Sequence, residues 1–141
     1  MGSPPVRSGP AAILDTHCLI WLKNQPDKLT AAQTTVLRGI QGRGRCVGIS
    51  AITLWEIAML VSKGRVQTAV PLSDLLERIE KDPTLVVLPL SGLVAAASVD
   101  LGEAFHGDPA DRLITATAKV YGLPLLTADQ RIRESGVVTV I

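Results

Sequence analysis

The sequence predicts an α/β fold in which a mostly parallel sheet lies between two layers of helices, a three-layer α/β/α arrangement. Short, continuous apolar runs recur along the 141 residues, as expected for strands buried on both faces. Longer segments with apolar residues at helical spacing separate these runs, and such alternation is typical of βαβ units. Because βαβ crossovers are right-handed, helices are expected on both faces of the sheet.

The first predicted elements are a strand and two helices. Residues 11–14 form a short apolar run that predicts a buried strand ending at Asp15. The apolar residues 18–22 predict a helix. Thr30 is a suitable N-cap for a second helix, which extends to about Gly39.

A second strand and a long helix follow. Residues 46–49 predict the strand, and Ser50 is placed to cap the next helix, which Gly64 ends. The expected apolar face of this helix consists of Ile52, Trp55, Met59 and Leu60.

The second half of the chain repeats this alternation. Residues 71–81 predict a helix, residues 85–88 a strand and residues 91–101 another helix. Residues 123–127 and 137–141 predict the last two strands.

The helix before these last strands has the clearest start in the chain. Asp108 is at the N-cap position, Pro109 at the first helical position, and Asp111 three residues after the cap. Gly122 is expected to end this helix.

Composition limits the cellular setting and the partners. Residues 1–10, with three prolines and two glycines, are expected to be a disordered leader, and residues 11–141 a single domain. The chain has neither a signal peptide nor an apolar run near the ~20 residues of a membrane helix, so a cytoplasmic protein without membrane contact is expected.

A net charge of +1 gives no overall attraction to nucleic acid. Cys18 and Cys46 lack metal-binding spacing and are expected to be reduced thiols.

Four acidic residues occupy positions that a folding argument alone does not explain. Asp15 follows the first strand, Glu56 interrupts an apolar helix, Asp111 opens a helix of small residues, and Asp129 follows residues 125–127. In a doubly wound sheet these positions can converge on one edge, where ligands bind. Clustered carboxylates either raise their pKa values or recruit cations. Since no His or Cys set accompanies the acids, Mg²⁺ or Mn²⁺ is the expected ion.

Each acid also has a structural explanation. Asp15 suits a strand-to-helix turn, and Asp129 suits the cap of a short helical turn. Asp108 and Asp111 together match a capping box, so Asp108 is either a cap or an additional metal ligand. Glu56 is the hardest to explain structurally, because charges on such a helix belong on the face opposite its apolar residues.

Four segments of the chain carry a resemblance to a known family, and together they cover nearly the whole predicted domain. They are residues 13–17, 50–57, 106–114 and 122–129. On these segments the chain resembles the PIN-domain ribonucleases, and among them the toxins of VapBC-type toxin–antitoxin pairs. The resemblance implies a PIN-like fold and a Mg²⁺- or Mn²⁺-dependent endoribonuclease. It also implies a homodimer inhibited by a small antitoxin protein, in a hetero-oligomer that binds operator DNA.

The resemblance assigns roles to individual residues. The four acids of the family fall on Asp15, Glu56, Asp111 and Asp129, which would bind the ion that activates water to hydrolyse RNA. Thr16, Ser50 and Thr127 match hydroxyl residues that flank these acids, and are expected to support them or to cap helices.

Other polar residues are candidates for minor roles. His17 and His106 are either proton carriers or solvent-facing residues. Arg112, directly after Asp111, is a candidate RNA contact or a balancing charge. Base stacking is not predicted, because aromatic residues do not interleave with the basic ones. Further candidate RNA contacts near predicted loops and helix ends are Arg43, Arg45, Lys63, Arg65, Arg131 and Arg133.

Two other classes of function remain open at this stage. A phosphoacceptor signalling domain also combines a parallel sheet with acids at its strand ends, but it leaves Glu56 without a role and lacks the expected lysine near the final strands. A catalytically silent module that only binds an antitoxin is the other alternative.

Overall fold

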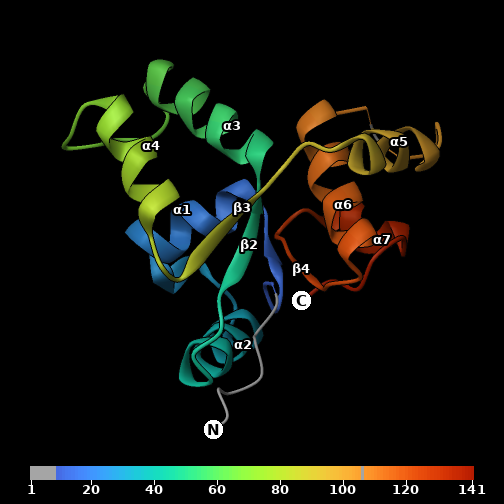
Figure 1. Cartoon of the computed structure of the whole chain (residues 1–141), viewed down its shortest axis with the longest axis horizontal. Coiled ribbons are helices and arrows are strands. Elements are labelled where there is room, and N and C mark those ends of the chain that lie inside the picture. Colours follow the sequence, from blue (N-terminus) through green and yellow to red (C-terminus); the bar gives the residue numbers. More distant parts are fainter. Residues whose placement is uncertain (1–8, 106) are drawn as a thin grey trace, which may run out of the picture.

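One parallel sheet organises the molecule. The computed structural model describes residues 9–105 and 107–141, and within them the strands lie in the order β3-β2-β1-β4 (Figure 1). All neighbouring strands pair in parallel, which confirms the predicted α/β class. The strands are β1 (Ile13–Leu14), β2 (Val47–Ser50), β3 (Leu85–Leu88) and β4 (Leu125–Leu126).

The helices begin close to the predicted positions. Thr30, Ser50, Ser91 and Asp108 each accept a backbone N–H at the start of the helix that follows. Gly122 ends α6 in the left-handed conformation, with φ of 65°. The described helices are α1 (Thr16–Asn24), the 3₁₀ helix η1 (Pro26–Lys28), α2 (Ala31–Gly42), α3 (Ala51–Ser62), α4 (Leu72–Lys81), α5 (Gly92–Asp100), α6 (Pro109–Tyr121) and α7 (Gln130–Ser135).

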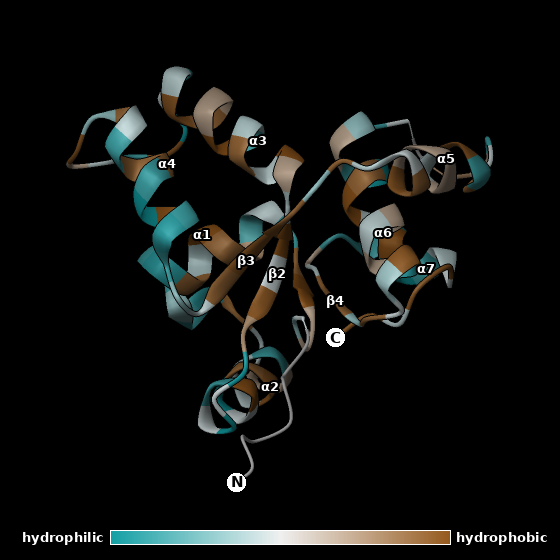
Figure 2. Ribbon diagram, viewed as in Figure 1, coloured by the Kyte–Doolittle hydropathy of each residue, from teal (hydrophilic) through white to brown (hydrophobic). Residues whose placement is uncertain are grey.

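Successive strand residues serve opposite faces of the sheet. Leu14 and Leu126 belong to a buried cluster with residues of α1, α2 and α4. Ile13 and Leu125 belong to a second cluster, which includes residues of α6 and α7. This alternation follows from the two-residue period of a strand, and both faces of the strands are therefore apolar (Figure 2). The sheet is the middle one of three layers (Figure 1).

The order of the strands reverses beside β1. The chain passes from β1 to β2 and β3 in one direction, then returns past β1 to β4 on its other side. In open α/β sheets, the binding crevice lies beyond the carboxyl ends of the strands at such a reversal. Asp15 follows β1 and Thr127 follows β4, so both residues lie at this point.

The predicted strand over residues 137–141 is reduced to a single bridge. Val140 pairs in parallel with Leu125, and no other part of this segment joins the described sheet. Because β4 is only two residues long, it offers little length for a fifth strand to pair with.

The predicted buried face of α3 is wrong. Trp55 is 57% exposed, and the buried residues of the helix are Thr53 and Ile57. Since α3 is apolar around almost its whole circumference, apolar spacing alone did not identify the side that packs.

The junction between the predicted leader and the predicted domain is in contact with the rest of the fold. Pro10 is buried, and the N–H of Ala11 donates to the carbonyl of Cys46 at 2.9 Å. Residues 1–8 of the predicted leader lie outside the described residues. In the described part of the chain, no helix is long and apolar enough to cross a membrane.

Candidate active site

A single cavity of about 330 Å³ collects the predicted acids. They come from distant parts of the chain and meet beyond the carboxyl ends of β1 and β4. The convergence expected from a doubly wound sheet is therefore observed. The lining residues are Asp15, Thr16, His17, Trp21, Glu56, Asp108, Asp111, Ala128 and Asp129.

The carboxylate of Asp15 is held through both of its oxygens. One oxygen accepts the N–H of Cys18 at 2.8 Å, which makes Asp15 the N-cap of α1. The other oxygen accepts the hydroxyl of Thr127. Asp15 is only 8% exposed, so these bonds replace most of its lost hydration. Asp15 therefore occupies the strand-to-helix turn suggested by its structural interpretation, and it also lines the cavity.

The adjacent cysteine does not offer a thiolate to the site. Burial, and then the negative charge of Asp15, raise the pKa of the Cys18 thiol. Cys18 and Cys46 are both free; Cys18 is buried, whereas Cys46, also expected to be buried, is only partly so.

Glu56 is held by a chain of two hydroxyls. Its Oε1 accepts the hydroxyl of Thr16, whose Oγ1 lies 3.0 Å from Oγ1 of Thr53. Because the single hydroxyl proton of Thr16 goes to Glu56, Thr53 is the donor to Thr16. Thr53 lies one helical turn before Glu56 on α3 and is fully buried.

The surroundings of Glu56 favour its neutral form. Burial makes the largest contribution and raises the pKa of the carboxyl, while the hydrogen bond from Thr16 partly offsets it. The negative charges of Asp111 and Asp108 raise this pKa further, and His17 lowers it. Like charges therefore lie close enough to act on one another, as a metal site would require.

The remaining acids combine capping with a place in the cavity. Asp108 accepts the N–H of Asp111 at 3.0 Å, so the predicted cap is present although both residues line the cavity. Asp129 caps α7 by accepting the N–H groups of Arg131 and Ile132 at 2.8 and 3.3 Å. The guanidinium of Arg131 lies 3.6 Å from the second carboxylate oxygen of Asp129.

The three predicted supporting hydroxyls divide into two groups. Thr16 and Thr127 donate to acids of the cavity, and Oγ1 of Thr127 also accepts the N–H of Asp129 at 3.0 Å. Ser50 is buried and caps α3 through the N–H of Ile52 at 3.2 Å, without lining the cavity.

Arg112 holds the segment between α5 and α6. Its guanidinium donates to the carbonyls of Ser98, Gly102 and Phe105 and lies 5.6 Å from the ring centroid of Phe105. A contact with RNA would require Arg112 to give up some of these bonds. His17 is exposed at the cavity, whereas His106 lies outside the described residues.

Two residues of the site were not identified from the sequence. Thr53 precedes Glu56 by three residues, and Trp21 follows His17 by four, so helical spacing alone relates each to a known neighbour. Helical spacing identifies Thr53 and Trp21 as site residues only once the inward faces of α1 and α3 are known.

The donor set fits a hard divalent cation, since every candidate ligand is a carboxylate. Across residues 9–105 and 107–141, no three acidic, imidazole or thiol groups lie close enough together to hold an ion directly. Mg²⁺ commonly uses one or two carboxylates and keeps several waters, and this arrangement allows that mode.

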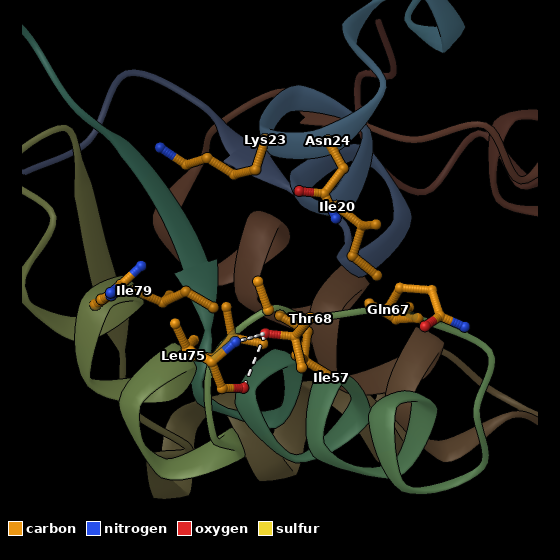
Figure 3. A pocket seen from close by; sticks show the side chains of 12 residues that line it. Ile20, Lys23, Asn24, Ile57, Gln67, Thr68, Leu75 and Ile79 are labelled. Atoms are coloured by element: carbon orange, nitrogen blue, oxygen red, sulfur yellow. Dashed lines mark hydrogen bonds between the residues drawn. The ribbon is translucent and has the colours of Figure 1, made fainter.

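A second cavity, of about 250 Å³, lies between α1, α3 and α4 and is mainly apolar. We call it the apolar groove. Figure 3 shows Ile20 of α1, Ile57 of α3 and Leu75 of α4 around it, with the Lys23 ammonium at its edge. Lys23 also forms an ion pair with Asp82 at 2.6 Å.

Comparisons with known proteins agree with this geometry. The sequence model of the PIN domain matches residues 12–137. Ribonuclease VapC22 of Mycobacterium tuberculosis is 35% identical over 121 residues, which are 86% of this chain and 88% of that protein. A structure of FitAB bound to the IR36 DNA fragment is 25% identical with a TM-score of 0.63, covering 92% of this chain and 93% of that one. VapBC2 from Rickettsia felis, bound to a promoter DNA fragment, gives 18% identity and a TM-score of 0.67, covering 92% and 96%. The chain belongs to the PIN-domain family.

Proposed function

We propose that this chain is a Mg²⁺- or Mn²⁺-dependent endoribonuclease and the toxin of a toxin–antitoxin pair. The observation that carries the proposal is the meeting of five carboxylates in one cavity, at the point where the strand order reverses. Membership of the PIN-domain family and the similarity to Ribonuclease VapC22 support RNA as the substrate.

The acids have distinct proposed roles. Asp15 and Asp111 would hold the main ion, and Glu56 and Asp129 would complete its surroundings through water or a second ion. Asp108 is an additional candidate ligand, beside its role as a cap. When bound, the ion supplies a water of lowered pKa and positive charge for the scissile phosphate.

The chain itself supplies orientation. The hydroxyl of Thr127 and the N–H of Cys18 fix the carboxylate of Asp15, and Thr16 fixes that of Glu56. Carboxylates that are already oriented need less reorganisation when the substrate arrives, which is a general source of rate. No nucleophilic side chain is required by this scheme.

The proposed partners are a cognate antitoxin and a second copy of the chain. The FitAB structure, which contains a bound DNA fragment, supports an assembly of this kind. We place the protein in the cytoplasm, where RNA and antitoxin would be available.

The two other classes of function are less well supported. A phosphoacceptor domain gives no role to Glu56 or Asp111, which line the cavity with Asp15. A silent binding module gives no reason for the hydroxyls that hold Asp15 and Glu56 in place.

The test is metal-dependent cleavage of an RNA panel that includes total cellular RNA. The wild type is expected to cut with Mn²⁺ or Mg²⁺ and to stop in EDTA, and Asp15→Asn and Glu56→Gln are expected to lose about 100-fold or more in rate. Asp74→Asn, which changes an exposed acid on α4, is the matched control and should cut normally. If the two cavity variants cut as fast as the wild type, the proposal is wrong.

A further inference from the structure

One wall of the acid cavity is aromatic. His17 and Trp21 lie one turn apart on α1, and both line the cavity. Their ring centroids are 6.1 Å apart, with the planes tilted by 55°. The ammonium of Lys28 lies 6.0 Å from the ring centroid of Trp21. Lys28 belongs to η1 and does not itself line the cavity. We call His17 and Trp21 the α1 wall.

Trp21 is anchored on one side and open on another. It is partly buried against the core cluster that contains Leu19, yet it also lines the cavity. His17 and Lys28 beside it are exposed. The α1 wall therefore presents a partly buried ring and an exposed ring to the cavity, with an exposed cation beside Trp21.

Without a bound cation, the rest of the lining does not attract RNA. Five carboxylates oppose the negative phosphates, and the net charge of +1 gives no compensating overall attraction. Stacking of a base on an aromatic ring does not depend on charge, because every base has a π-face. The α1 wall is thus the part of the cavity that can attract a nucleotide before the acids act on it.

The other tryptophan does not share this position. Trp55 is 57% exposed on α3, although it directly precedes Glu56, and it does not line the cavity. The chain therefore contains an exposed tryptophan of the same chemistry that can act as an internal control.

We propose that the α1 wall is a subsite for one unpaired nucleobase, which stacks on Trp21 while Lys28 meets an adjoining phosphate. This inference rests on the proposed ribonuclease function and adds to it the position at which one base of the substrate is held. A base held within a duplex cannot stack on a protein ring without leaving its own stack. The subsite therefore takes a base that is already unpaired.

The two tryptophans make a direct binding test available. In an Asp15→Asn background, chosen because its cutting is expected to be slow, Trp55→Phe leaves Trp21 as the sole tryptophan and Trp21→Phe leaves Trp55. Each protein is titrated with a fluorescently labelled single-stranded RNA and with the same sequence as a duplex. The anisotropy of the label reports binding, and tryptophan emission reports stacking. We expect the single strand to quench Trp21 and leave Trp55 unchanged, and the duplex to bind more weakly.

Kinetics with the cutting protein provide the second measurement. Trp21→Leu should raise KM for single-stranded RNA by about 5- to 150-fold, as expected for loss of one stacked base, with a smaller effect on kcat. Trp21→Phe, which keeps a ring, should recover most of this loss, and Trp55→Leu should behave as wild type.

The outcomes separate the two proposals. If single-stranded RNA binds without changing the emission of Trp21, the subsite is wrong while the ribonuclease can still be correct. If the wild type neither binds nor cuts RNA with Mn²⁺, the proposed function is wrong. The subsite proposal, which rests on that function, is then wrong as well. Because the emission test keeps Trp21 intact, it remains decisive even if Trp21→Leu does not fold.

Discussion

The acid cavity and the apolar groove both include side chains of α1 and α3, but the chemistry of the two linings differs. On α1, Thr16 and Trp21 line the cavity, whereas Ile20 lines the groove; on α3, the neighbours Glu56 and Ile57 divide in the same way. Adjacent residues of a helix point about 100° apart, so a single step along α3 passes from one surface to the other.

This difference teaches how each surface is maintained. The apolar side chains of the groove hold their positions by excluding water. Polar contacts of its lining join Thr68 to Val70 and Lys23 to Asp82. In the cavity, half-buried carboxylates must be satisfied individually, and specific hydroxyls perform that task. Groove residues should therefore affect stability, and cavity residues should affect activity. The following predictions test this division, beginning with the largest effect.

The largest expected effect on stability is at Ile57. This side chain is 3% exposed, and Ile57→Ala should lower the free energy of unfolding by about 2–5 kcal/mol through lost burial and the cavity left behind. Urea unfolding followed by circular dichroism measures the loss. A change below about 1 kcal/mol would show that the groove side of α3 is not a packed surface.

Outside the acids and the α1 wall, the largest expected effect on activity is at Thr53. Thr53→Val keeps the shape of the side chain but removes the donor to Thr16, so Glu56 loses its fixed orientation. We expect cutting to fall by about 10- to 100-fold, with a parallel loss of Mn²⁺ affinity measured by electron paramagnetic resonance. Thr53→Ser, which restores the hydroxyl, should recover both.

Thr117 provides a matched control for Thr53. It is equally buried, but its hydroxyl donates to the carbonyl of Leu113 at 2.7 Å in its own helix and does not touch the acids. Thr117→Val should leave Mn²⁺ affinity unchanged. If both valine variants weaken Mn²⁺ binding equally, Thr53 has a general packing role and does not position Glu56.

A smaller effect is expected at Glu56, where replacement should raise the stability of the fold, in contrast to the loss expected at Ile57. Burial raises its pKa in the folded protein, so the folded state retains the proton more strongly than the unfolded chain. Its contribution to stability is complete below the ordinary pKa of glutamate and is lost as the pH rises through the raised value. Glu56→Gln should therefore increase Tm by a few degrees at most at neutral pH in EDTA.

Thermal unfolding across a pH series tests the sign. The advantage of Glu56→Gln over the wild type should shrink as the solution is acidified below the ordinary glutamate range. An advantage that grows on acidification would mean that the carboxylate form is the one that the fold stabilises.

The smallest effect is expected at Lys28. If its ammonium meets one phosphate, Lys28→Gln should weaken single-stranded RNA binding a few-fold and flatten the dependence of log K on log salt by about 0.7. Lys81→Gln, which removes an exposed cation paired with Glu77 on α4, is the comparison and should leave that slope unchanged. Equal slopes for the wild type and Lys28→Gln would remove Lys28 from the subsite.

Local sequence signals predicted the parts of the fold that they determine. Caps such as Thr30 and Ser50 act within a few residues, so the helix starts were predicted closely. The acids were identified because a charged residue within an apolar stretch can be recognised from the sequence, whatever the fold. The fold class followed from alternation of the elements, which tolerates errors in their individual ends.

Features that depend on tertiary contacts were not predictable in the same way. The inward face of α3 could not be read from a helix that is apolar all round, so Trp55 was misassigned and Thr53 was missed. Two of the carbonyls that accept from Arg112, those of Gly102 and Phe105, belong to a loop whose path the sequence does not reveal. The predicted strand over residues 137–141 is reduced to one bridge because β4, the strand it pairs with, is short. The length of β4 could not be predicted from residues 137–141 themselves.

The direct junction between β2 and α3 has a consequence for how this chain can change in evolution. Ser50 is both the last residue of β2 and the cap of α3, so no loop absorbs a shift in length between them. One residue inserted or deleted between Ser50 and Glu56 would turn the carboxylate by about 100° away from the cavity and bring a neighbour into its place. The exposed stretch between α3 and α4 carries no such angular constraint. Length variation among relatives should therefore accumulate in that stretch, while the spacing from Ser50 to Glu56 stays fixed.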